Sequence, residues 1–104
     1  MRANQIRKHW LRKGYTMYED LIFDSHAHYD DEAFDADREK LLENMQKNGV
    51  GYIVNASANM DDSRKILELT KTYDFLYGSA GVHPSDVMEF TDENFSCIEA
   101  MLAQ

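Results

Sequence analysis

The sequence predicts an α/β fold in which parallel strands and helices alternate along the chain. Three apolar segments, residues 21–28, 50–56 and 75–82, are each followed by a segment with the spacing of an amphipathic helix. Strands in such a repeat are parallel and joined by right-handed crossovers, so their carboxyl ends meet at one rim of the sheet. A chain of 104 residues has room for one small domain, and its 43% hydrophobic content is compatible with a packed core.

The first unit consists of a strand over residues 21–28 and a helix over residues 36–48. The strand begins with a nearly continuous apolar run, which predicts burial on both faces of a parallel sheet. Asp35 is the expected N-cap of the helix, and Gly49 is the expected glycine that ends it.

The second unit has a strand over residues 50–56 and a helix from about Met60 to Tyr73, which Asn59 or Asp61 caps.

The third unit begins with a strand over residues 75–82, and Pro84 stops its hydrogen-bond ladder. Thr91 or Asp92 then begins a last helix, over residues 93–103.

His26 and His28 are the candidate metal ligands. Residues i and i+2 of a strand point to the same side, so both imidazoles face one point at the carboxyl end of the first strand. Imidazole nitrogen suits zinc, iron and nickel, and a catalytic metal normally needs at least three protein ligands. Asp24 lies on the same face of the strand as the two histidines. Its role is that of a third ligand, of a partner that orients an imidazole, or only of a polar residue at the strand end. The alternative for the pair is two exposed histidines that bind nothing.

Charge is distributed unevenly along the chain. All 19 acidic residues lie after Met17, whereas five of the 11 basic residues lie within the first 13 positions. An acidic body repels polyanions at long range, so contact with nucleic acid requires a local site or a bound cation. Residues 1–16 form a basic N-terminal extension, which we expect to be a mobile terminus or a mis-assigned extension upstream of a start at Met17.

The composition favours the cytoplasm. The single cysteine excludes an internal disulfide, and no apolar run approaches the length that a membrane helix needs, so we expect no membrane contact.

Two motifs together resemble the TatD family of metal-dependent deoxyribonucleases, a branch of the amidohydrolase-like superfamily. They are residues 23–30 (FDSHAHYD) at the first strand and residues 81–84 (GVHP) at the end of the third. The histidine pair alone also occurs in other amidohydrolases and in PHP-type phosphoesterases, and the second motif makes the resemblance more specific. The match extends from about Met17 to the last residue.

The resemblance implies a (β/α)8 TIM-type barrel with a two-metal centre that hydrolyses phosphodiester bonds of DNA. It implies that His26 and His28 are metal ligands, for Zn, Mg or Mn, and that His83 contacts the substrate phosphate. Residues 17–104 then form the N-terminal three-eighths of the barrel. The remaining ligands and the catalytic acid and base are expected beyond residue 104, so we expect this fragment alone to be inactive.

Two further readings remain open. An incomplete barrel leaves an open sheet edge, which favours a non-catalytic metal-binding or self-associating module. A PHP-type phosphoesterase fragment also fits the histidine pair.

Asp30 and Asp31 lie near the rim, where we expect a solvated loop rather than a catalytic role.

Overall fold

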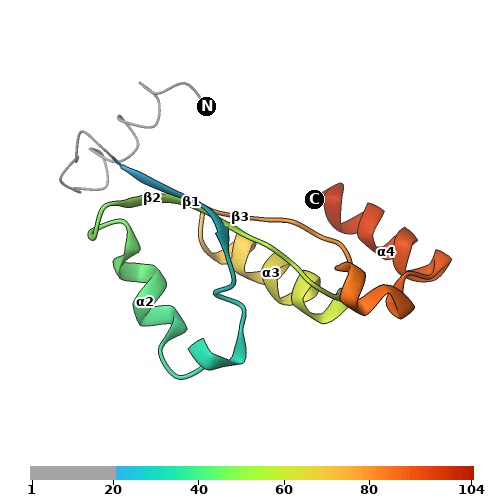
Figure 1. Cartoon of the computed structure of the whole chain (residues 1–104). Helices are drawn as coiled ribbons and strands as arrows, with labels where there is room; N and C mark the ends of the chain where they lie inside the picture. The colour runs from blue at the N-terminus through green and yellow to red at the C-terminus, as the bar shows by residue number, and fades with distance from the viewer. Residues whose placement is uncertain (1–20) are drawn as a thin grey trace.

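The computed structural model describes residues 21–104. Its strands are β1 (Ile22–Ala27), β2 (Val50–Asn55) and β3 (Leu76–Gly78), its α-helices are α2 (Arg38–Met45), α3 (Met60–Thr72) and α4 (Asp92–Leu102), and its 3-10 helices are η1 (Glu32–Phe34) and η2 (Pro84–Glu89) (Figure 1). The predicted N-terminal extension and the alternative start at Met17 lie outside the described residues. Within residues 21–104, no helix is long and apolar enough to cross a bilayer.

The three strands form one parallel sheet in the order β1-β2-β3. This confirms the predicted α/β architecture and places the three carboxyl ends on one rim. The pairing of β1 with β2 is irregular between Ile22 and Phe23, and again between Asp24 and Ala27. The second irregularity lies where β1 approaches the rim, in the segment that carries His26.

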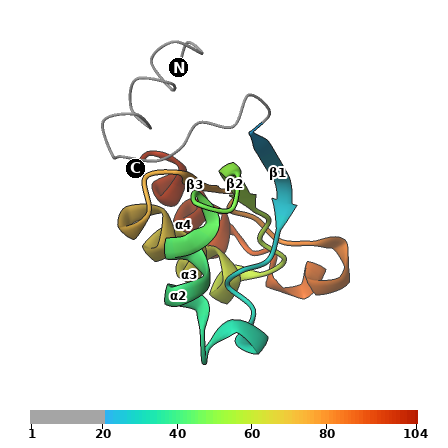
Figure 2. The same ribbon diagram turned by 90° about the vertical axis from the view of Figure 1, so that its left-hand side faces the viewer.

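Helices α2 and α3 cover one face of the sheet (Figures 1 and 2). The core lies between them and the strands, and its buried members are Ala27, Leu42, Met45, Ile53, Phe75 and Leu76. Ile66 of α3 is also fully buried. Burial of apolar surface on this side is the main force that holds the three units together.

The other face of the sheet is not covered by the described residues. An aromatic row crosses it, with ring centroids 6.1 Å apart between Phe23 and Tyr52 and 6.0 Å apart between Tyr52 and Tyr77. The prediction that the first strand is buried on both faces is therefore wrong here, because Ile22 and Phe23 are 60% and 59% exposed. β1 is also an edge strand of the described sheet, and no helix of residues 21–104 packs over its aromatic face.

The observed N-caps of α3 and α4 are residues that the sequence predicted, whereas the N-cap of α2 is not. The side chains of Asn59 and Thr91 accept hydrogen bonds at the starts of α3 and α4, as predicted. Helix α2 begins at Arg38 rather than after Asp35, because residues 32–34 form a 3-10 turn first and Asp35 closes that turn. Helix α2 ends at Met45, and the turn that follows it reaches Gly49 with φ of 90°.

The third strand is shorter than predicted. β3 ends at Gly78, and residues 79–82 leave the sheet as an extended loop. Pro84 opens η2, a 3-10 helix that the sequence analysis did not anticipate, although proline is well suited to the first position of a helix. The apolar residues of α4 are only partly buried, since Ile98 is buried while Phe95 and Leu102 are exposed.

Helix α3 packs tightly against β3 at Gly78, and this predicts a measurable stability effect. A Cβ atom at Gly78 would overlap with Cγ2 of Ile66, which is itself fully buried. We expect Gly78→Ala to lower the free energy of unfolding by about 1–3 kcal/mol, as overpacking of a core does. Urea denaturation of the chain measures this loss.

Gly81→Ala is the matched control, because a Cβ atom there would meet no atom within 4 Å. Its free energy of unfolding should stay within about 0.5 kcal/mol of the unsubstituted chain. Equal losses for the two variants would contradict the close approach of α3 to β3.

Candidate metal centre

His26 and His28 lie side by side at the carboxyl end of β1. His26 belongs to the strand, His28 directly follows it, and both side chains are exposed. Their ring centroids are 5.0 Å apart, and the ring planes make an angle of 77°. The two rings are therefore neighbours at the strand end, and their convergence on one bound ion stays a prediction.

Asp24 fixes the backbone and the loop next to this pair. One carboxylate oxygen accepts a hydrogen bond from the backbone N–H of His26 at 3.3 Å, and the other accepts one from the hydroxyl of Tyr29 at 3.4 Å. The pKa of Tyr29 is raised by burial, and further by the charge of Asp24 and the hydrogen bond to it. Asp24 therefore joins the strand to the loop that follows.

Asp30 is buried, which corrects the expectation that it lies on a solvated loop. It is only 3% exposed, and its Oδ1 has no hydrogen-bond partner among the described residues. Burial raises the pKa of its carboxyl, and the charge of Asp62 raises it further, while Lys65 opposes the shift. Asp31 is exposed as expected, and its carboxylate accepts a hydrogen bond from the backbone of Ala33.

Asn55 is a rim residue that the sequence analysis missed. It ends β2, is fully buried, and accepts a hydrogen bond through Oδ1 from the backbone N–H of Tyr29 at 3.3 Å. Its Nδ2 has no partner among residues 21–104. The available signal was a polar residue at the end of an otherwise apolar strand, at the same rim as the histidines.

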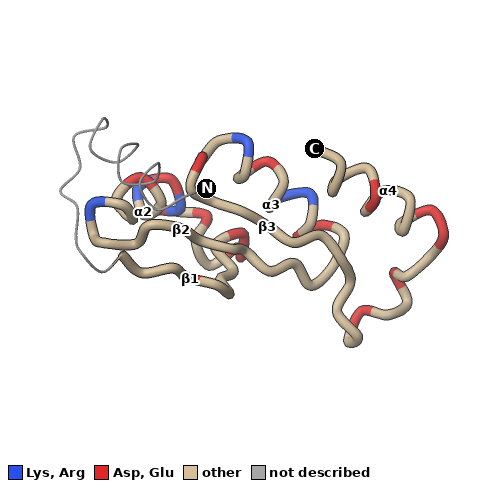
Figure 3. The backbone as a smooth tube through the Cα atoms, turned by 90° about the horizontal axis from the view of Figure 1, so that it is seen from above, with Lys and Arg blue, Asp and Glu red and all other residues tan. Residues whose placement is uncertain are grey.

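The charges around the rim are mostly negative. Lys and Arg gather on and around α2 and α3, whereas every charged residue of η2 and α4 is Asp or Glu (Figure 3). The loop between β1 and α2 adds Asp30, Asp31, Glu32, Asp35 and Asp37. A polyanion is therefore repelled by the rim unless cations bind there.

His83 lies on the loop that follows β3, not at the strand end where the sequence analysis placed it. Its backbone N–H donates to the carbonyl of Ala58 at 2.7 Å. Its Nδ1 accepts a hydrogen bond from the backbone N–H of Ser85 at 3.1 Å, so the side chain caps η2. The ring is exposed, and the cap fixes its orientation.

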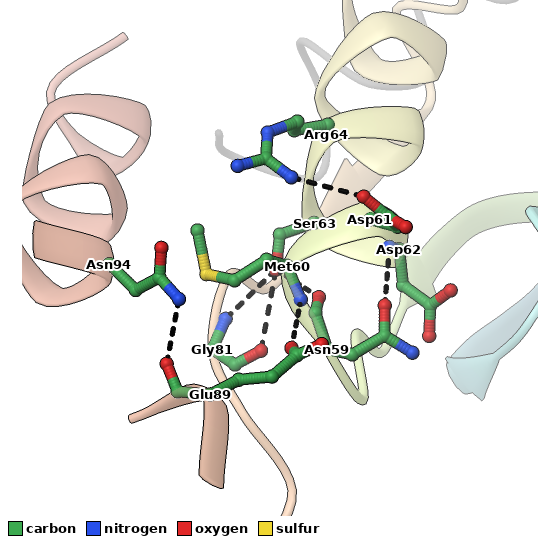
Figure 4. Close-up of polar contacts among 9 residues, drawn as sticks. All are labelled: Asn59, Met60, Asp61, Asp62, Ser63, Arg64, Gly81, Glu89 and Asn94. Atoms are coloured by element: carbon green, nitrogen blue, oxygen red, sulfur yellow. Dashed lines mark hydrogen bonds and ion pairs between the residues drawn. The ribbon is translucent and has the colours of Figure 1, made fainter. Parts of the chain in front are cut away.

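The start of α3 holds the loop that carries His83 (Figure 4). The Oγ of Ser63, only 1% exposed, accepts a hydrogen bond from the backbone N–H of Gly81 at 3.1 Å. At the other end of η2, Glu89 accepts one from the backbone N–H of Met60 at 3.0 Å, and its carbonyl accepts one from Asn94 at 2.8 Å. The loop is thus attached to α3 on both sides of His83.

The described residues offer part of a metal site. His26 and His28 supply two imidazoles of the type that divalent transition metals bind. Within residues 21–104, no group of three or more His, Cys, Asp or Glu side chains is arranged to hold a metal ion. The donor chemistry of the pair fits a divalent metal, and two imidazoles are fewer than the three protein ligands that a catalytic zinc site normally has.

Comparison with known proteins identifies the family. The family model described as TatD related DNase matches residues 23–104, and the chain belongs to this family. The metal-dependent hydrolase YabD of Bacillus subtilis is 31% identical over 83 residues, which are 80% of this chain and 32% of that protein. The "3'-5' ssDNA/RNA exonuclease TatD" of Cronobacter sakazakii is 24% identical over 83 residues, with the same two shares.

A solved structure shows the same architecture. The crystal structure of YjjV, a TatD homologue from Escherichia coli, matches with a TM-score of 0.67 and 27% identity, over 79% of this chain and 32% of YjjV. The three βα units therefore form part of a TatD-type barrel, and the family match favours TatD over the PHP-type reading. The chain spans about a third of the length of these relatives.

The buried contact between Asn55 and Tyr29 predicts a stability effect at the rim. Asn55→Ala removes the acceptor for the backbone N–H of Tyr29 and leaves a small cavity. We expect a loss of about 1–3 kcal/mol in the free energy of unfolding, the usual result of leaving a buried polar group unpaired. Urea denaturation measures it, with Asn48→Ala as the control because Asn48 is exposed on the turn before β2. A loss no larger than that of the control would contradict the role given to Asn55.

Proposed function

We propose that His26 and His28 are two ligands of a divalent-metal centre in a TatD-type hydrolase that cleaves phosphodiester bonds of DNA. The observation that carries the proposal is the pair of exposed imidazoles, 5.0 Å apart, at the rim of a chain that belongs to the TatD family. By the resemblance, the complete centre holds two metal ions, with Zn, Mg or Mn as candidates. The composition favours a cytoplasmic location for this activity.

His83 is proposed to bind the substrate phosphate. Because its Nδ1 accepts the N–H of Ser85, the neutral ring carries its proton on Nε2. An Nε2–H group donates a hydrogen bond to a phosphate oxygen and has no lone pair for a metal. This tautomer agrees with the role that the resemblance implies for His83.

The proposed mechanism also depends on the charge of the bound metal ions and of the acidic residues around the rim. Bound divalent ions lower the pKa of a water ligand and stabilise charge on the phosphoryl oxygens. The acidic residues around the rim repel a polyanion, and cations held by His26 and His28 would offset that charge. Asp24 holds the backbone N–H of His26, and we propose that it keeps the end of β1 in place while metal binds.

A second candidate function is a metal-binding module without catalysis that associates with itself. The aromatic row on the uncovered sheet face favours it, since Phe23 and Tyr77 are 59% and 48% exposed. Large exposed apolar patches commonly mark interaction surfaces. If this second function is correct, His26 and His28 bind metal and the chain hydrolyses no phosphodiester.

A chimera tests the hydrolase proposal. Residues 21–104 replace the matched segment of the Cronobacter sakazakii exonuclease, and cleavage of labelled single-stranded DNA is followed with Mg²⁺ or Mn²⁺. We expect the chimera to cleave DNA, and we expect the double substitution His26→Ala, His28→Ala to lower its rate at least about 100-fold, because outer-shell changes alone cost 10–100-fold in metal sites. The 104-residue chain by itself should show no turnover.

Asn48→Ala in the same chimera is the control, since Asn48 lies before β2 and therefore at the opposite end of the sheet from the histidines. Circular dichroism confirms that each variant is folded. An unchanged rate in a folded double variant would refute the proposed role of the histidine pair.

A further inference from the structure

The loop that follows His28 turns several backbone carbonyls toward one side chain. Nε of Arg38 donates to the carbonyl of Tyr29 at 2.6 Å, and Nη2 donates to the carbonyls of Asp30 and Asp31 at 3.2 and 2.7 Å. The same Nη2 lies 2.6 Å from a carboxylate oxygen of Asp35. One guanidinium therefore contacts three consecutive peptide groups.

Arginine suits this position for geometric and electrostatic reasons. A planar guanidinium presents several N–H donors in a fixed arrangement, whereas a lysine ammonium acts as a point charge on a flexible stem. Arg38 is also the only Lys or Arg between Lys13 and Lys40, in a stretch rich in Asp and Glu. Its side chain is only 20% exposed, so its hydrogen bonds are partly shielded from water.

The salt bridge with Asp35 does not explain the position. The side chain of Asp35 is 67% exposed, and an ion pair at such a site contributes little to stability. The bonds to the carbonyls of Tyr29 and Asp30 are partly buried, and Asp30 itself is only 3% exposed. The main structural role of Arg38 is therefore to hold the loop.

The loop in turn holds the end of β1. Asp31 donates its backbone N–H to the carbonyl of His28 at 3.1 Å, and Asn55 accepts the backbone N–H of Tyr29. The peptide groups after His28 are thus held on their carbonyl side by Arg38 and on their amide side by Asn55 and His28 itself. Because this loop is joined to His28, any movement of the loop also moves the backbone of His28.

We propose that Arg38 is a positioning residue that keeps His28 beside His26 by binding the carbonyls of residues 29–31. The consequence for metal binding rests on the proposed function, whereas the consequence for the loop does not. Groups that orient metal ligands typically change metal affinity by 10–100-fold when removed. The two consequences are measured separately.

Amide hydrogen exchange of the metal-free chain tests the effect on the loop. We expect Arg38→Ala to speed exchange at Tyr29 and Asp31 at least about tenfold, because losing a hydrogen bond to a charged group is worth that factor or more. The amide of Ile53, which bonds to Phe75 inside the sheet, should exchange at an unchanged rate. Arg64→Ala is the matched control, since Arg64 lies on α3 and forms an exposed i,i+3 ion pair with Asp61.

Unchanged exchange at Tyr29 and Asp31 would overturn the proposal. An equal increase at Ile53 would also overturn it, because it would show a general loss of stability. If the alanine variant does not fold, Arg38→Lys replaces it. We expect a smaller but still selective increase in that variant, since an ammonium cannot reproduce the planar arrangement of donors.

Titration with Zn²⁺ tests the consequence for the metal centre. We expect Arg38→Ala to bind Zn²⁺ about tenfold or more weakly, with Arg64→Ala unchanged. An unchanged affinity in Arg38→Ala, when binding by the unsubstituted chain requires His26 and His28, would contradict the positioning role. If the unsubstituted chain does not bind Zn²⁺ through these histidines, the proposed function fails, and the exchange experiment still decides the role of Arg38 in the loop.

Discussion

Parallel pairing of β1 with β2, and of β2 with β3, places the polar residues of the candidate site on one rim. The pairing continues just past the strands, because the backbone N–H of Ala56 donates to the carbonyl of Ala27 at 2.8 Å and that of Ser79 donates to the carbonyl of Asn55 at 3.0 Å. These bonds align the starts of the loops that follow the three strands, so the loops leave the sheet at the same edge. The side chains on those loops therefore lie on the same rim of the sheet.

Buried polar contacts hold these loops in place. Asn55 and Ser63 are both almost completely buried, and each accepts a hydrogen bond from the backbone of a rim loop. In a region of low dielectric such bonds are strong, and the cost of breaking them favours a single loop conformation. The exposed histidines are therefore supported by side chains that take no direct part in binding. Support from buried side chains leaves both imidazoles exposed while the backbone that carries them is held in place.

The sequence predicted the periodic features and missed those that depend on tertiary contacts. Alternation of apolar segments predicted the strands and helices, and strand periodicity predicted that His26 and His28 face one point. Asp30 looked solvated from its acidic neighbours, yet the fold buries it between loop and helix. The end of β3 and the position of η2 depend on the contacts of Ser63 with Gly81 and of Glu89 with Met60, which join segments far apart in the sequence and which no local pattern reveals. The exposure of Phe23 depends on which face the helices cover.

X-ray absorption spectroscopy at the zinc edge most directly tests the claim that the two histidines form one site. The measurement uses the chain with one equivalent of Zn²⁺ and a His9→Ala substitution, which removes the histidine that lies outside the described residues. We expect two imidazole nitrogens at about 2.0–2.1 Å, with oxygen ligands completing the coordination. We also expect His83→Ala to leave the spectrum unchanged. Zinc bound without imidazole, or a spectrum that changes only when His83 is removed, would contradict the claim that the two histidines form one site.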